Sequence, residues 1–204
     1  FYKGEDMGEK IKVIMDCDPG IDDGIALAYA AAHQDEIELL AVTTFAGNQT
    51  IDKVTKNALE LVDFYGLKVP VARGQERPLV KEVIHAEEFH GETGLGHCVL
   101  PETGTKAASD NAVFFIREIL DDLPEGQQVT FIETAPMTNL ALLLRVFPEV
   151  KDKIRRIVFM GGAVKGGNVT PAAEFNIYAD PEAAKIVFEA GIPLVMCGLD
   201  ATMK

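Results

Sequence analysis

The residues with the clearest chemical potential form an acidic cluster near the N-terminus, Asp16-Cys17-Asp18-Pro19-Gly20-Ile21-Asp22-Asp23. It holds four carboxylates within eight residues and directly follows an apolar run. Four like charges in one turn repel each other, and each raises the pKa of its neighbours. A bound cation removes this conflict. Because the donors are all oxygen, they favour a hard ion, Ca²⁺ or Mg²⁺, over zinc.

Two other interpretations of this cluster are open. In the simpler one, Asp22 and Asp23 cap a helix and Pro19-Gly20 forms a turn, which explains one or two of the acids but not four. In the other, Asp16-Cys17-Asp18 is the Asp-x-Asp turn of a Mg²⁺-dependent phosphatase that forms an aspartyl-phosphate. Residues 19–23 do not resemble the usual continuation of such enzymes, so this is the second choice.

The elements that must position the cluster alternate between apolar strands and amphipathic helices. We expect strands over residues 11–15, 37–43, 69–72, 129–133, 154–160 and 192–197. Helices are expected over 22–33, 50–65, 109–123 and 137–147, and from Asp180 to Gly191. Ser109 or Asp110 is the expected cap of the third helix. This order predicts the α/β class, with an open, mainly parallel sheet and helices on both faces. Such sheets bind ligands at the carboxyl ends of their strands, where the acidic cluster lies.

Residues 11–204 are expected to form one domain and residues 1–10 a tail. Two long loops, 74–108 and 161–179, interrupt the alternation, and loops of this length are usually functional or mobile. After the last strand the chain continues through Gly198-Leu199-Asp200, and no helix is expected to follow and cover the sheet. We therefore expect a fold that is incomplete at its C-terminus.

Composition excludes several classes of partner. The net charge of −13 argues against nucleic acid and anionic membranes, both of which require basic patches. Apolar runs such as 25–32 are too short to span a bilayer. The three cysteines are widely spaced and form no CxxC pair, which indicates a reducing compartment, and we expect a cytoplasmic protein. Cys17 is expected to be a small buried residue, and His33 and His85 to be surface residues.

The acidic cluster closely resembles the signature of the inosine-uridine-preferring nucleoside hydrolase family. Further strings match that family in order along the chain: Thr43-Thr44-Phe45-Ala46-Gly47-Asn48, His90-Gly91-Glu92-Thr93-Gly94, Met160-Gly161-Gly162, Ala173-Glu174-Phe175-Asn176-Ile177 and Asp180-Pro181-Glu182-Ala183-Ala184. The first and last strings are specific, and together the matches extend from Ile11 to Asp200. The resemblance implies a Rossmann-like fold and calcium-dependent hydrolysis of ribonucleosides to ribose and free base. It also implies a homodimer or homotetramer.

The resemblance assigns roles position by position. Asp18 and Asp23 resemble calcium ligands, joined by the backbone carbonyl of Thr134, and Asp18 also resembles the general base that deprotonates the attacking water. The positions that resemble substrate contacts are Asp22 and Asn48 for ribose hydroxyls, Asn168, Glu174 and Asn176 for the far side of the sugar and its 5′-hydroxyl, Met160 and Phe175 for the floor and wall of the pocket, and His90 for the base. Glu174 and Asn176 would share one face of an extended segment.

The chemistry requires residues of these types. Cleavage of a glycosidic bond passes through an oxocarbenium-like sugar and needs an activated water, a sugar held by its hydroxyls, and a proton donor for the departing base. The family carries a His-Asp pair beyond the last residue of this chain, so we expect the 204-residue chain to bind calcium weakly and to be largely inactive. A non-catalytic calcium or nucleoside binder is a further alternative. Glu133, beside Thr134, is an acid of undecided role.

Overall fold

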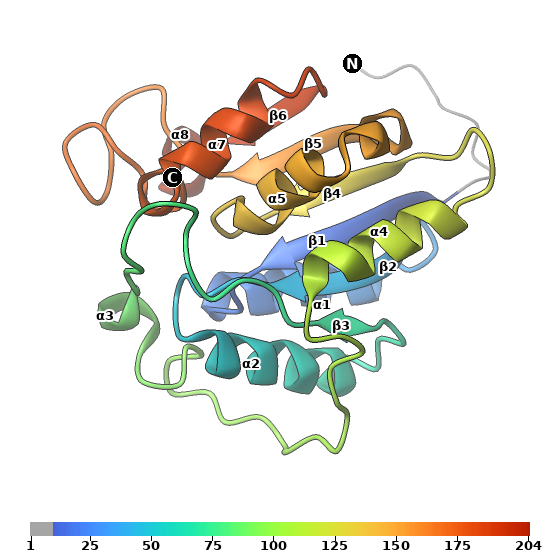
Figure 1. Ribbon diagram of the computed structural model, residues 1–204. Coiled ribbons are helices and arrows are strands. Elements are labelled where there is room, and N and C mark those ends of the chain that lie inside the picture. The colour runs from blue at the N-terminus through green and yellow to red at the C-terminus, as the bar shows by residue number, and fades with distance from the viewer. Residues whose placement is uncertain (1–9) are drawn as a thin grey trace.

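The computed structural model describes residues 10–204, and its centre is one six-stranded sheet (Figure 1). The strand order is β3-β2-β1-β4-β5-β6, and every neighbouring pair is parallel. The strands are β1 (Ile11–Cys17), β2 (Ile37–Thr44), β3 (Val71–Ala72), β4 (Val129–Glu133), β5 (Ile154–Met160) and β6 (Leu194–Cys197). The predicted α/β fold with a parallel sheet is confirmed. The expected tail, apart from Lys10, lies outside the described residues.

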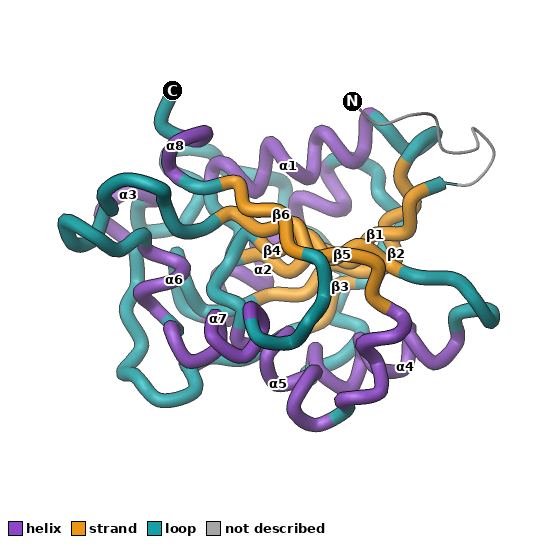
Figure 2. Tube along the Cα trace, turned by 90° about the horizontal axis from the view of Figure 1, so that it is seen from above, coloured by secondary structure: helices purple, strands orange, loops and turns teal. Residues whose placement is uncertain are grey.

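Helices pack on both faces of this sheet (Figure 2). One face is covered by α1 (Ile21–Ala32) and α2 (Ile51–Phe64), the other by α4 (Ala112–Asp122), α5 (Thr138–Val146) and α7 (Pro181–Phe188). The alternation of side chains along β1 feeds both cores, because Met15 and Cys17 pack toward α1 and α2 while Ile14 packs toward α4 and α5. Cys17 is fully buried, as expected.

The chain reverses its winding between β1 and β4, which are neighbours in the sheet although β2 and β3 lie between them in sequence. At such a point the two crossover connections leave on opposite sides and open a crevice beyond the carboxyl ends of the strands. Asp16 of β1 lies in register with Glu133 of β4, so the residues that follow both strands meet in this crevice. The acidic cluster and Thr134 are those residues.

The long loops contain short helices that the sequence did not reveal. Loop 74–108 contains α3 (Glu87–His90), and loop 161–179 contains α6 (Phe175–Ala179). The prediction of an extended segment at Glu174 was wrong, because its carboxylate accepts hydrogen bonds from the next turn and caps a helix.

Two smaller predictions also need correction, on the cap of α4 and on the chain after β6, and residues 148–153, for which no prediction was made, form a short helix. The cap of α4 is Asn111 rather than Ser109 or Asp110, because Asn111 Oδ1 accepts from Val113 N and Phe114 N. The segment before β5 is a 3₁₀ turn, η1 (Pro148–Lys153). A four-residue helix, α8 (Leu199–Thr202), follows β6 where none was expected.

Among residues 10–204, no helix is both long enough and apolar enough to cross a bilayer.

Candidate active site

Asp18 directly follows β1 and is 1% exposed. Its Oδ2 accepts a hydrogen bond from Asn48 N at 2.7 Å, and its carbonyl oxygen accepts one from Asn48 Nδ2 at 2.9 Å. Gly47 allows this close approach, since a β-carbon there would lie 2.0 Å from Asp18 Oδ2. The turn after β2 therefore fixes the side chain of Asp18.

Asp23 lies in the first turn of α1 and is also buried. Its Oδ2 accepts from Gly20 N at 3.2 Å, whereas Oδ1 is buried without a hydrogen-bond partner. Burial and the Asp22 carboxylate raise the pKa of Asp23 to about 7. Burial and the Asp23 carboxylate raise the pKa of Asp18 well above its usual value. A cation between the two carboxylates would relieve both penalties.

Thr134 supplies a third oxygen at this point. Its backbone N–H donates to Asp16 O at 2.9 Å, and its carbonyl oxygen accepts from Asn176 Nδ2 at 2.9 Å. Among the described residues no three His, Cys, Asp or Glu side chains gather as a metal cluster on their own, so a cation here would need the carbonyl. Two carboxylates, one of them with an unpaired oxygen, and one carbonyl are a donor set that fits Ca²⁺ or Mg²⁺.

The start of α6 closes the site beyond β4 and β5. Asn176 Nδ2 donates to Thr134 O and, at 3.0 Å, to Met160 O at the end of β5. The carboxylate of Glu174 is engaged with backbone N–H groups, because Oε1 accepts from Asn176 N and Oε2 from Gly162 N and Ile177 N. Within this chain Glu174 therefore joins the loop after β5 to α6.

The remaining predicted site residues lie around this centre. His90 ends α3 with a buried, unpaired Nδ1, and a β-carbon at Gly20 would lie 2.4 Å from that atom and 2.8 Å from Asn48 Nδ2. Asp22 is exposed at the start of α1. Asn168 is exposed and its Oδ1 accepts from Phe175 N at 2.9 Å. The tightest group comprises Asp18, Asp23, Asn48, His90, Thr134, Met160 and Asn176, at the ends of four neighbouring strands.

Comparison with known proteins shows the family to which the chain belongs. The sequence profile described as "Inosine-uridine preferring nucleoside hydrolase" matches residues 13–204. This chain belongs to that family. It is 50% identical over 195 residues to the pyrimidine-specific ribonucleoside hydrolase RihA of Salmonella typhimurium, covering 95% of this chain and 62% of the relative. It is 51% identical over 191 residues to the protein of that name from Photobacterium profundum, covering 93% and 61%.

Solved structures of nucleoside hydrolases share the fold. The purine-preferring ribonucleoside hydrolase from Gardnerella vaginalis superposes with a TM-score of 0.86 at 37% identity, covering 93% of this chain and 61% of its own. A plant nucleoside hydrolase gives a TM-score of 0.87 at 35% identity, covering 94% and 61%. This chain thus spans about three-fifths of the length of the relatives it matches. The phosphatase alternative is not favoured by these matches.

Several buried polar residues of this nucleoside hydrolase chain were missed in the sequence. Asn139 of α5 donates through Nδ2 to Asp16 Oδ1 and to Thr44 O, both at 2.9 Å. Asn57 of α2 donates through Nδ2 to Pro19 O at 3.1 Å and so connects the acidic turn to α2. Both amides stand within apolar helix faces, and a buried amide in such a place needs a partner. A polar residue on an otherwise apolar helix face was therefore the sequence feature that could have identified Asn57 and Asn139.

His85 was expected at the surface, and the structure gives it intermediate exposure with a contact that the sequence did not predict. The ring is partly buried, and its Nδ1 lies 3.2 Å from Gly47 O, next to Asn48. His33 has the same intermediate exposure and stacks on exposed Tyr29 at the end of α1.

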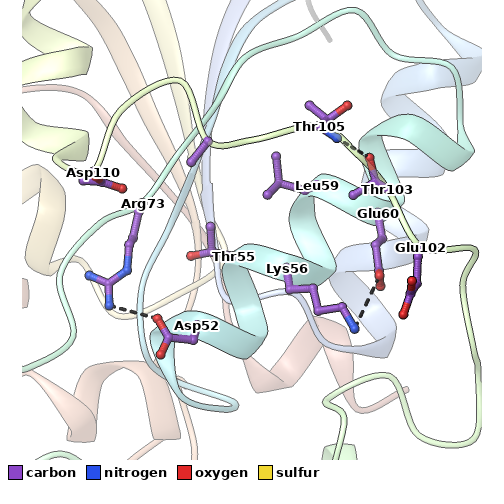
Figure 3. Close-up of a pocket in the computed structure, with 11 residues that line it drawn as sticks. Asp52, Thr55, Lys56, Leu59, Glu60, Arg73, Glu102, Thr103, Thr105 and Asp110 are labelled. Carbon is purple, nitrogen blue, oxygen red and sulfur yellow. Dashed lines mark hydrogen bonds and ion pairs between the residues drawn. The ribbon is translucent and has the colours of Figure 1, made fainter.

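A separate cavity of about 460 Å³ lies between α2 and the segment 102–110 (Figure 3). Its two cations are already paired, Arg73 with Asp52 at 3.1 Å and Lys56 with Glu60 at 3.5 Å. None of the residues of the acidic turn line it. The candidate site is therefore the acidic turn and the strand ends around it, and this cavity is separate from it.

Proposed function

We propose that this protein is a calcium-dependent nucleoside hydrolase, which cleaves the N-glycosidic bond of ribonucleosides to release ribose and a free base. The observation that carries the proposal is the buried pair Asp18 and Asp23, with Asp23 hydrogen-bonded to the Thr134 side chain, at the winding reversal of the sheet. Asp18, Asp23 and the Thr134 carbonyl would hold the cation. When bound, it would lower the pKa of water toward neutrality and so supply the nucleophile.

Asp18 is suited to be the general base. Burial and the Asp23 carboxylate raise the pKa of Asp18 in the metal-free chain, which makes its carboxylate a better proton acceptor than an ordinary aspartate. Asn48 N holds Oδ2, which keeps the carboxylate from rotating. In the reaction, the water oxygen bonds to the anomeric carbon, its proton passes to Asp18, and the C–N electron pair leaves with the base.

The sugar would lie between two groups of residues. Asn48 and Asp22 lie on the side of the acidic turn, and Asn176, Met160 and the start of α6 lie on the side of β5. Ribose hydroxyls held from both sides keep the anomeric carbon in line with the water. We assign Asn168, Glu174 and Phe175 to the outer sugar pocket, with Glu174 acting through α6, and His90 to the base.

Pyrimidine ribonucleosides are the proposed first substrates, because the relatives at 50–51% identity are named as pyrimidine-specific. The homodimeric or homotetrameric state and the cytoplasmic location, predicted from the sequence, stay predictions.

The test is ribose release from uridine, cytidine and inosine by the full-length gene product with calcium. Asp18→Asn keeps the shape but removes the base, and we expect kcat to fall about 10²–10⁴-fold. Asp52→Asn, at an exposed carboxylate paired with Arg73, is the matched control and should match the parent. No ribose from any of the three nucleosides would refute the proposal. Phosphate release from p-nitrophenyl phosphate with magnesium would instead support the phosphatase alternative.

A further inference from the structure

Residues 75–90, here called the crossing loop, run along the carboxyl edge of the sheet. In Figure 1 the loop leaves β3, passes the strand ends toward α7 and α8, and returns to α3. Gln75 O accepts from Ala46 N at 3.1 Å at the start of the loop. The loop therefore touches the turn after β2 before it crosses the site.

At its far end the crossing loop is fastened to α6 and α7. Leu79 N donates to the buried carboxylate of Asp180 at 2.9 Å. Lys81 Nζ donates to Tyr178 O at 2.5 Å and lies 3.4 Å from the centre of the Tyr178 ring. This end of the loop is thus tied to the helices that carry Asn176.

His85 fastens the returning part of the loop to the opposite side of the site. Its Nδ1 lies 3.2 Å from Gly47 O, and since a carbonyl oxygen can only accept, the ring must carry a proton on Nδ1. The ring is partly buried, which limits competition from water. Lys81 and His85, four positions apart, therefore connect the two sides of the proposed sugar pocket.

Gly47 is a sensitive point for such a contact. Its backbone lies so close to Asp18 that a β-carbon there would be 2.0 Å from Oδ2. The next residue, Asn48, makes both hydrogen bonds that hold Asp18. A shift of the Gly47 carbonyl would therefore move the Asn48 amide relative to the proposed base.

We propose that His85 is a positioning residue for nucleoside hydrolysis: its Nδ1–H holds Gly47 O, which keeps the side chain of Asn48 in place against the ribose. This inference rests on the proposed function. His85 acts through the turn and not on the reacting atoms. Removal of the His85 ring should therefore raise KM more than it lowers kcat.

Three variants of the full-length protein test the inference. His85→Leu removes the donor, and His85→Asn keeps a donor at the place of Nδ1 but cannot act as an acid or base near neutral pH. His33→Leu is the matched control, because His33 Nδ1 also contacts a backbone carbonyl, Tyr29 O at 2.9 Å, but stands on the outer side of α1.

We expect His85→Leu to raise KM for uridine about tenfold with little change in kcat, as the loss of one hydrogen bond implies. His85→Asn should restore KM to within about threefold of the parent and keep its pH profile. Parental KM in His85→Leu would overturn the proposal. So would an Asn variant as impaired as the Leu variant with a changed pH profile, because His85 would then transfer a proton.

A second readout does not depend on activity. Hydrogen–deuterium exchange of the peptide that spans residues 44–50 should be faster in His85→Leu, and unchanged in His85→Asn and His33→Leu. Unchanged exchange in His85→Leu would show that His85 does not hold the turn. If the parent released no ribose, the proposed function would fail while this exchange result still decided the structural contact.

Discussion

The carboxyl groups of Asp16 and Glu133 lie in register on β1 and β4, both buried. Asp16 Oδ1 accepts from Thr43 Oγ1 and Asn139 Nδ2, whereas Asp16 Oδ2 and both Glu133 oxygens have no partner while both groups are ionised. A proton on Glu133 would allow it to donate a hydrogen bond to Asp16. Burial raises the pKa of Asp16 to about 6, and burial with the Asp16 charge raises the pKa of Glu133 well above its usual value. Two ionised groups here would destabilise the fold.

Glu133→Gln should therefore stabilise the metal-free protein at pH 8, by about 1–3 kcal/mol in the free energy of unfolding, because an amide has no charge to bury. At about pH 3, where the glutamate is protonated in both states, the gain should vanish. Urea unfolding at the two pH values measures it, with Glu125→Gln at an exposed position as control. Equal stability of variant and parent at pH 8 would mean that the buried carboxyl of Glu133 does not destabilise the fold.

The stability of the metal-free protein should also depend on pH. Asp16 and Asp23 have pKa values of about 6 and about 7 in the folded state, above the 3.8 of an unperturbed aspartate. These two carboxyls therefore bind protons more tightly in the folded state than in the unfolded state. Their protonation stabilises the fold fully below about pH 4, and this contribution to the free energy of unfolding is lost as pH rises toward about 7. Thermal melts in a chelating buffer should show the midpoint falling over this range. A midpoint that rises from pH 4 to 7 would contradict the assignment.

Among the elements, the crossing loop and the start of α7 are both hydrogen-bonded to one carboxylate. Asp180 is fully buried and accepts from Leu79 N, Thr138 Oγ1 and Ala183 N. It therefore joins the crossing loop, the start of α5 and the start of α7. A helix cap that also holds two other elements couples their stabilities.

Asp180→Asn should destabilise the protein by about 2–4 kcal/mol, because the amide nitrogen cannot accept and leaves a buried donor unpaired. Asp52→Asn should change the stability by less than about 0.5 kcal/mol, because its pair with Arg73 is exposed. Urea unfolding of both variants makes the comparison. An Asp180 variant as stable as the Asp52 variant would refute this role.

On the scale of the whole molecule, the site depends on the reversal of winding between β1 and β4. Thr134 and Asp16 are 118 positions apart in sequence, yet Thr134 N donates to Asp16 O. The strand order brings Thr134, which follows β4, next to the acidic turn that follows β1, where the Thr134 side chain hydrogen-bonds with Asp23. Cation binding should therefore stabilise the whole sheet and not a single loop.

Calcium should raise the thermal midpoint of the full-length protein, by an amount that corresponds to about 2.7 kcal/mol at a hundredfold excess over Kd. Asp23→Asn should respond differently from the parent to the removal and addition of calcium. Without metal it should be more stable than the parent at pH 8, because a buried charge is gone, and calcium should add little. Differential scanning calorimetry with and without EGTA measures both. An Asp23 variant that gains as much from calcium as the parent would exclude Asp23 as a ligand.

The sequence by itself determined the features that depend on neighbouring residues. The spacing of the acids in Asp16–Asp23 predicted the oxygen-rich turn, and apolar runs predicted β4 and β5 with their observed bounds. The Asp-Pro pair at Asp180 predicted the start of α7. These signals are local, because strand propensity, helix caps and turns are set within a few residues.

Only the tertiary structure decided which distant groups meet. The extended segment expected at Glu174 is a helix because its carboxylate finds backbone donors there and at Gly162. His85 contacts Gly47 because the crossing loop brings it there. Asp16 and Glu133, 117 positions apart by their numbers, become one buried pair because β1 and β4 are neighbours in the sheet. Such contacts leave no local pattern, since they depend on the order in which strands pair.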